Sequence, residues 1–149
     1  MKRCLIVALF TTLILILTAC ATKPQQHYFS CKQQNPAVVF DYFPLAFQNI
    51  GYDLLSNDST NWTMEAIRNI KITNTKKGVL KESVIIRVVF NFKQNDTTNS
   101  TITQFYQTDI NGTVKRKALT KQQEALYGKD ATNLQTKTLF YCNPEFKGR

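Results

Sequence analysis

The residues that could carry out covalent or acid–base chemistry are few. The chain contains one histidine, His27, four cysteines and ten carboxylates. A Ser–His pair and a multi-histidine metal site both need imidazoles held inside a fold. The sequences HExxH, CxxC, GxSxG and SxxK are absent, and the five glycines form no phosphate-binding cluster. The sequence therefore predicts a non-catalytic protein without metal or cofactor, and only a glycosidase-like pair of carboxylates stays open by counting.

The amino-terminal segment is predicted to be an export signal. Lys2 and Arg3 supply positive charge, and residues 5–17 form a 13-residue apolar run. A membrane-spanning helix needs about 20 apolar residues, whereas a secretory signal needs a basic start and roughly 7–15. The run is therefore better suited to a signal that is removed.

The end of this segment, Leu17-Thr18-Ala19-Cys20, resembles the lipobox of bacterial lipoproteins. The resemblance covers residues 1–20. It implies that the Cys20 thiol receives a diacylglyceryl group, that cleavage occurs just before Cys20, and that the new terminus is acylated in many species, with palmitate among the chains. Two or more acyl chains anchor a protein stably. The alternative is an ordinary signal peptide with a cysteine at its cleavage site.

The lipobox sets the expected domain organisation and location. We expect a signal peptide over 1–19, a lipid-bearing polar tether over 20–26 and a single periplasmic domain over 27–149. Position 21 is Ala and not Asp, which in enteric-type Gram-negative lipoproteins implies sorting to the outer membrane. The inner membrane and the cell surface stay open as locations.

Two cysteines remain after cleavage and lipidation, Cys31 and Cys142. Because the periplasm is oxidising, we expect them to form the single disulfide of the domain. The bond would close a loop of about 110 residues, for which the chain-entropy model gives about 4.7 kcal/mol. A competing hypothesis makes Cys31 a nucleophile with His27 as its base, but a thiol in an oxidising compartment suits catalysis poorly.

Two short helices are predicted. Apolar residues at i, i+3, i+4 and i+7 favour a helix over 44–50, with Pro44 in its first turn and Gly51 just past its end. This apolar stripe would form core or line a ligand groove. Thr120 is a good N-cap for a second helix over 122–127.

The remaining pattern is typical of an antiparallel sheet. Residues 66–117 are predicted to form a meander, with Asn111-Gly112 as a tight hairpin, while 56–63 is predicted to be a polar loop. The expected fold is α+β with the helices on one face of the sheet. The predicted strands are 27–31, 66–73, 84–92, 101–110, 113–117 and 134–142.

Charge gives the best indication of a partner. Without Lys2 and Arg3 the chain has 17 basic and 10 acidic residues, a net charge of +7. Opposite charge in the envelope is carried by lipopolysaccharide, anionic phospholipids and acidic protein surfaces, and we expect no nucleic acid there. The same lysines would also protect sheet edges. The candidate anion-binding residues are Lys76, Lys77, Lys81, Lys115, Arg116 and Lys117.

These observations predict a lipid-anchored scaffold or assembly factor of a larger envelope or secretion complex. An inhibitor or immunity protein against an envelope-targeting enzyme or toxin is the main alternative, since a rigid disulfide-closed domain binds at low entropic cost. A basic target such as lysozyme would be repelled by the net charge. A binder of lipid or polysaccharide is the third hypothesis.

Overall fold

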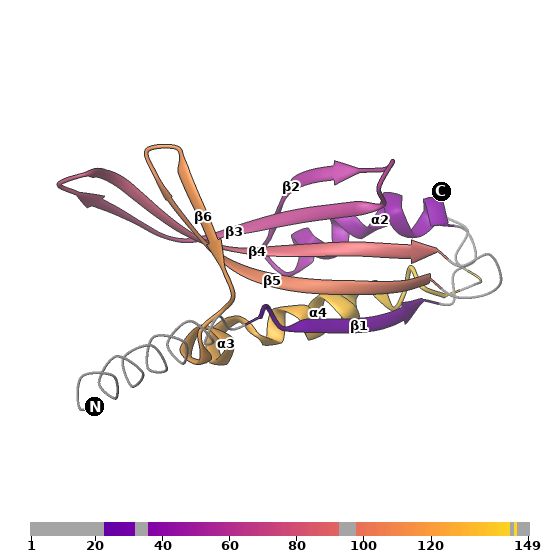
Figure 1. The fold of residues 1–149 in the computed structure, drawn as a ribbon. Coiled ribbons are helices and arrows are strands. Elements are labelled where there is room, and N and C mark those ends of the chain that lie inside the picture. Colours follow the sequence, from indigo (N-terminus) through magenta and orange to yellow (C-terminus); the bar gives the residue numbers. More distant parts are fainter. Residues whose placement is uncertain (1–22, 32–35, 93–97, 144, 146–149) are drawn as a thin grey trace, which may run out of the picture.

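The computed structural model describes residues 23–31, 36–92, 98–143 and 145. The predicted signal peptide and the predicted lipidation site, Cys20, lie outside these residues. Figure 1 shows one sheet with helices packed against it. The elements are β1 (Gln26–Cys31), α2 (Pro36–Asn49), β2 (Asp53–Asp58), β3 (Thr63–Thr75), β4 (Gly78–Phe92), β5 (Thr98–Ile110), β6 (Thr113–Lys117), α3 (Lys121–Tyr127) and α4 (Lys129–Thr138).

The sheet is antiparallel and contains six strands in the order β1-β5-β4-β3-β2, with β6 also paired to β5. The predicted α+β class and the meander over 66–117 are confirmed. Its hairpin has positive φ at both Asn111 (51°) and Gly112 (84°), as a tight type I′ turn requires. Beyond the helices, the β3–β4 hairpin and the β5–β6 hairpin each project as an arm (Figure 1). The two arms remain joined, because β4 and β5 are paired as far as Leu80 and Ile110 and the Asn111 side chain donates a 2.7 Å hydrogen bond to the Lys77 carbonyl.

The core lies between α2 and one face of the sheet. Alternate residues of β4, among them Val84, Ile86 and Val88, are fully buried and pack with Phe43 and Phe47 of α2. The Phe43 ring lies 5.3 Å from Phe47, in an edge-to-face arrangement. Apolar residues recur at every second position along residues 84–92, so the sequence pattern of this strand agrees with the inward face that the structure shows.

Helix α2 is longer than the predicted helix over 44–50. It starts at Pro36, and Pro44 lies inside it rather than in its first turn. Pro36 is suited to a helix start because it has no N–H to satisfy. Val39 and Phe40 are buried and extend the same apolar stripe, so packing against the sheet outweighs the missing hydrogen bond at Pro44.

The predicted strand over 134–142 is wrong, because α4 and a turn occupy this region. Ala131, Leu134 and Thr138 are buried at i, i+3 and i+7, which is a helical spacing. Helix α3 agrees with the prediction. Thr120 and Gln123 form a reciprocal capping box, which satisfies two amides at the helix start.

Strand β2 is not predicted by the sequence, and its last three residues fall in the segment 56–63, for which the sequence predicts a polar loop. β2 is an edge strand in which every residue except the half-buried Asp58 is exposed, so burial leaves no alternating pattern. The turn that follows it is held by Asp58, whose side chain accepts a 2.7 Å hydrogen bond from the Asn61 amide and also accepts from the backbone. These bonds, led by the one from the Asn61 side chain, lower the pKa of Asp58.

Cys142 follows α4, and its side chain is 7% exposed. The predicted partner, Cys31, ends β1, but its side chain is outside those that the structure describes. Helix α4 contacts β1, which brings the two segments near each other. The pairing of Cys31 with Cys142 stays a prediction.

Candidate functional site

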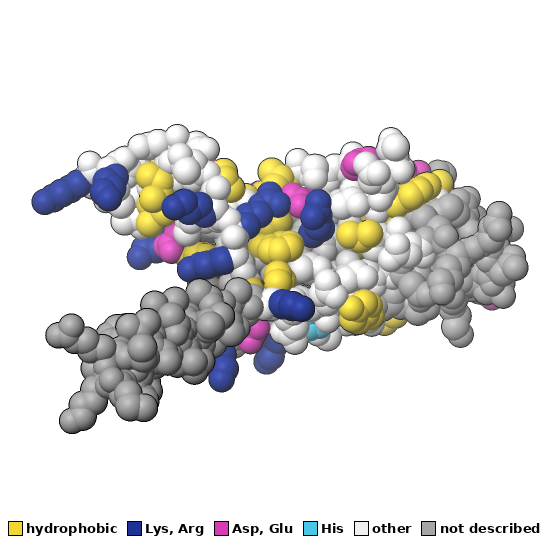
Figure 2. Space-filling model, viewed as in Figure 1, with side chains coloured by type: hydrophobic (Ala, Val, Ile, Leu, Met, Phe, Trp, Pro, Cys, Tyr) yellow, Lys and Arg dark blue, Asp and Glu magenta, His cyan; other side chains and the backbone are white. Residues whose placement is uncertain are grey.

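Side chains on the face of the sheet opposite the helices form the first candidate site, which we call the open face. Strand register places Ile67, Ile85 and Phe105 side by side across β3, β4 and β5. Ile85 is fully buried although it is outside the main core. Figure 2 shows hydrophobic side chains near the middle of this face, with Lys and Arg side chains around them.

A buried carboxylate joins two arginines on the open face. Glu65 is 8% exposed. Arg116 Nη1 lies 3.0 Å from each Glu65 oxygen, and its Nε donates to Gln107 at 2.8 Å. Arg87 Nε lies 3.2 Å from Glu65 Oε1, and the Arg87 side chain is half exposed. Two guanidinium groups against one carboxylate leave this network with a net positive charge.

The structure divides the predicted cluster Lys115-Arg116-Lys117 between the two faces of the sheet. Successive strand residues point to opposite faces, so Arg116 lies on the open face and its neighbours on the helix side. Lys117 Nζ lies 5.6 Å from the Tyr106 ring. Burial, and then a 2.5 Å hydrogen bond to Glu82, raise the pKa of Tyr106 to about 12.

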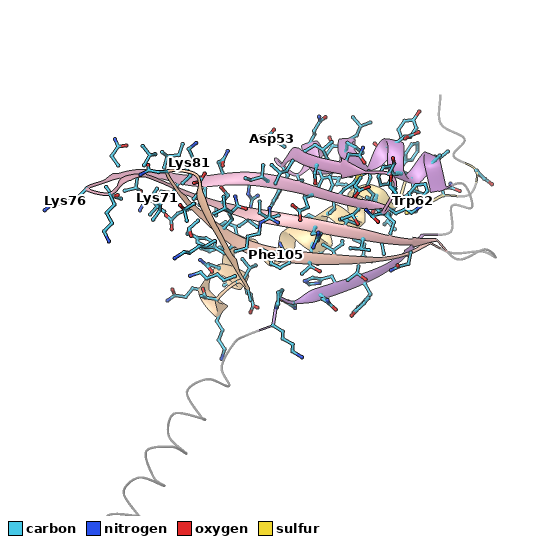
Figure 3. All side chains as sticks on the ribbon, turned by 45° about the horizontal axis from the view of Figure 1, so that its top comes forward. Asp53, Trp62, Lys71, Lys76, Lys81 and Phe105 are labelled. Carbon is cyan, nitrogen blue, oxygen red and sulfur yellow. The ribbon has the colours of Figure 1, made fainter. Side chains whose placement is uncertain are left out.

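The other predicted cluster follows the β3–β4 arm. Figure 3 shows Lys76 at the end of the arm, with Lys71 and Lys81 closer to the body of the domain. Lys76 and Lys77 form the exposed turn. Lys81 is opposite Asp109 in the register with β5. Only Lys81 of this cluster is therefore placed beside the open face.

The Cys31–His27 pair does not have the geometry of a nucleophile and its base. Both residues are on β1, and a strand rises about 3.3 Å per residue, so their Cα atoms are separated by roughly 13 Å. Hydrogen-bond reach is much shorter than this. In the part of the chain that the structure describes, no three His, Cys, Asp or Glu side chains are placed to hold a metal ion.

A second candidate site, which we call the Arg68 pocket, lies on the helix side of the sheet and was not predicted. Its volume is about 520 Å³, within the range of roughly 300–1,000 Å³ that is usual for small-ligand pockets. It is formed where the end of α2, the middle of β3 and one side of α4 meet. The residues that line it are Asn49, Ile50, Arg68, Asp130, Asn133, Thr136 and Lys137.

Arg68 and Asp130 form an ion pair at the bottom of this pocket. The same carboxylate oxygen accepts a 2.7 Å hydrogen bond from the hydroxyl of Tyr52, which is 1% exposed. Burial and the neighbouring Asp130 raise the pKa of Tyr52 well above its usual range. The Arg68 guanidinium carbon lies 4.7 Å from the Tyr52 ring centre and 5.4 Å from that of Tyr127. Two rings and a carboxylate therefore fix its position.

One sequence signal for the pocket was available. Arg68 shares its side of β3 with Ile70, so a charged residue occurs on the inward side of the strand. A charge in such a place needs a partner. That partner is 62 residues away, in the segment next to the wrongly predicted last strand, so the pair could not be identified.

The chain matches no protein-family model. No curated protein matches it either. Among solved structures, a DUF4468 family protein from Bacteroides ovatus aligns with a TM-score of 0.33 and 12% identity, covering 78% of each chain. A TBP-like protein from Parabacteroides distasonis aligns with a TM-score of 0.35 and 10% identity, over 81% of this chain and 89% of the other.

The helices in the described ranges, from residue 36 onward, include none that is long and apolar enough to cross a membrane.

Proposed function

We propose that this protein is a lipid-anchored, non-catalytic envelope lipoprotein that serves as a scaffold or assembly factor by binding an acidic protein through the open face. The observation that carries the proposal is the combination of apolar and cationic side chains on a sheet face that the helices leave uncovered. The pairing of Cys31 with Cys142 belongs to the same proposal, because it would tie β1 to the end of the helical layer.

The apolar part of the open face would supply most of the binding energy. Phe105 and Ile67 are partly accessible at its centre, while Tyr28 is 71% and Ile72 65% exposed near its margins. Large hydrophobic and aromatic groups together with arginine are typical of the energetic centre of an interface. A surface of this kind fits a folded protein better than it fits a solvated polymer.

The positive charge of the open face favours an acidic partner. Arg87 is half exposed and, with Arg116, leaves a net positive charge around Glu65. An acidic surface would complement it, whereas a basic one would be repelled. An inhibitor or immunity protein would use the same face, and the identity of the captured partner separates that alternative from a scaffold.

The lipid anchor would restrict where the partner is found. The tether over residues 20–26 can span at most about 25 Å when fully extended. The domain would therefore remain close to the membrane surface, within reach of proteins that assemble there.

The first prediction tests the open face. In cells, a photo-crosslinking residue at Phe105 should give a covalent adduct with an acidic protein, and one at the exposed Leu126 of α3 should not. The double variant Lys81→Gln/Arg87→Gln should reduce the Phe105 adduct several-fold, because it removes two cations from this face. Adducts are measured by immunoblot and identified by mass spectrometry.

The matched control removes the same charge from the other side of the sheet. Lys115→Gln/Lys117→Gln should leave the adduct at its original level, because both lysines are on the helix side. Glu65 keeps both of its contacts with Arg116 when Arg87 is replaced, and the three lysines are surface positions, where substitutions usually change stability by less than about 0.5 kcal/mol, so both double variants should fold. Equal loss in both variants, or adducts formed only with lipid, would contradict a specific open-face site.

The second prediction concerns the anchor. Cys20→Ser should abolish lipidation and give soluble periplasmic protein or uncleaved precursor, because the serine hydroxyl cannot form the thioether. Mass spectrometry and membrane fractionation measure the change. Cys4→Ser, which alters a cysteine inside the predicted signal peptide, is the control and should leave mass and fractionation of the mature protein unchanged. An unaltered lipidated mass in the Cys20 variant would refute the lipobox assignment.

A further inference from the structure

The Arg68 pocket has a size and position that the open-face function does not use. It lies on the opposite side of the sheet, so a protein on the open face would leave it accessible. Six of its seven lining residues are polar or charged, and Ile50 is the exception. The amide, carboxylate, guanidinium, hydroxyl and ammonium groups among them offer hydrogen bonds and charge to a polar ligand.

The cationic group of the pocket is held in place before any ligand arrives. Arg68 Nη2 donates to Asp130, and no described residue accepts a hydrogen bond from its Nη1 or Nε atoms. The arginine side chain is 29% exposed. Its aromatic neighbours and its ion pair limit its motion, so little conformational entropy remains to be lost on binding. The free donors of this guanidinium suit a carboxylate.

The other lining groups indicate the rest of the ligand. Asn133 and Lys137 are one helical turn apart on α4 and share a side of the helix. Asn49 approaches from the end of α2. Amide side chains both donate and accept hydrogen bonds, as sugar hydroxyl groups do.

The charge of the pocket indicates a single negative charge on the ligand. Arg68 and Asp130 neutralise each other, and Lys137 leaves an excess of one positive charge. A dianion such as a phosphate monoester would be brought close to the Asp130 carboxylate with only one uncompensated cation nearby. A monoanion fits this balance better.

We propose that the Arg68 pocket binds a carboxylated sugar of the uronic acid class. Its carboxylate is held by Arg68 and Lys137, and its hydroxyl groups are held by Asn49 and Asn133. The pocket has room for a monosaccharide unit, either free or at the end of an acidic polysaccharide.

Calorimetric titration of the mature protein in detergent tests this inference, with D-glucuronate, D-glucose and acetate as separate probes. Glucuronate should bind saturably, and more tightly than either probe that carries only part of its chemistry. A glucuronate-ended oligosaccharide forms a fourth arm. If the oligosaccharide binds more tightly than glucuronate, the natural ligand is the end of an acidic polysaccharide. If the two bind equally, the natural ligand is the free sugar. The proposal would be overturned if glucose or acetate bound with the same affinity as glucuronate. It would also be overturned if none of the probes gave a heat of binding.

Two variants localise the binding. Lys137→Gln should weaken glucuronate about fivefold, the effect of losing roughly 1 kcal/mol from one exposed charge contact, while Lys121→Gln on α3 should have no effect. Arg68→Lys keeps the charge but loses the planar donor arrangement, and should also weaken binding. Undiminished binding in both pocket variants would refute the site. Lys81→Gln/Arg87→Gln should bind glucuronate normally, which separates this inference from the proposed function.

Discussion

Phe43→Ala is expected to lower the free energy of unfolding by about 3–5 kcal/mol, the usual range for removing a fully buried aromatic ring. Phe43 has no exposed surface, and its ring lies 4.9 Å from that of Phe90 at a right angle. Its loss would open a cavity between α2 and β4 that the backbone on either side cannot close. Urea unfolding followed by circular dichroism measures the change.

Leu45→Ala is the matched control, because Leu45 is on the same helix and is 45% exposed. We expect less than about 1 kcal/mol from this substitution, in line with the ordinary range for surface positions. Similar losses from both variants would mean that α2 does not present the face described here to the sheet.

Cys31→Ser/Cys142→Ser is expected to lower the free energy of unfolding by about 2–5 kcal/mol. The predicted bond closes most of the domain into one loop, so its removal enlarges the unfolded ensemble. The side chain of Cys142 is buried in the core, and the serine hydroxyl there would add a desolvation cost. Unfolding curves recorded without reductant measure the effect.

The wild-type protein treated with reductant is the comparison for this double variant. Both should unfold at a similar, lower denaturant concentration, because both lack the bond. Two free thiols in the exported wild-type protein, or dimers linked through either cysteine, would show that Cys31 and Cys142 do not pair within the chain.

The parts of the fold that could be predicted depend on short-range chemistry. The hairpin at Asn111-Gly112 follows from two residues that tolerate positive φ. The start of α3 follows from Thr120 and Gln123, which are three residues apart and cap each other. The inward face of β4 follows from alternation over a long strand.

The parts that could not be predicted depend on contacts distant in the sequence. α4 buries Leu134 against elements formed much earlier in the chain, and this burial decides between helix and strand. The Glu65–Arg116 and Arg68–Asp130 pairs join residues 51 and 62 positions apart. Composition shows that these charges exist, but only the assembled sheet shows which of them face each other.

The tight β5–β6 hairpin also limits which insertions and deletions the chain can accept at its turn. β6 is only five residues long, and a shift of one residue in its pairing would exchange its two faces. A one-residue deletion in the turn would then move Lys115 and Lys117 to the open face and carry Arg116 away from Glu65. Insertions and deletions at this turn should therefore be tolerated less well than substitutions, although the turn itself is on the surface.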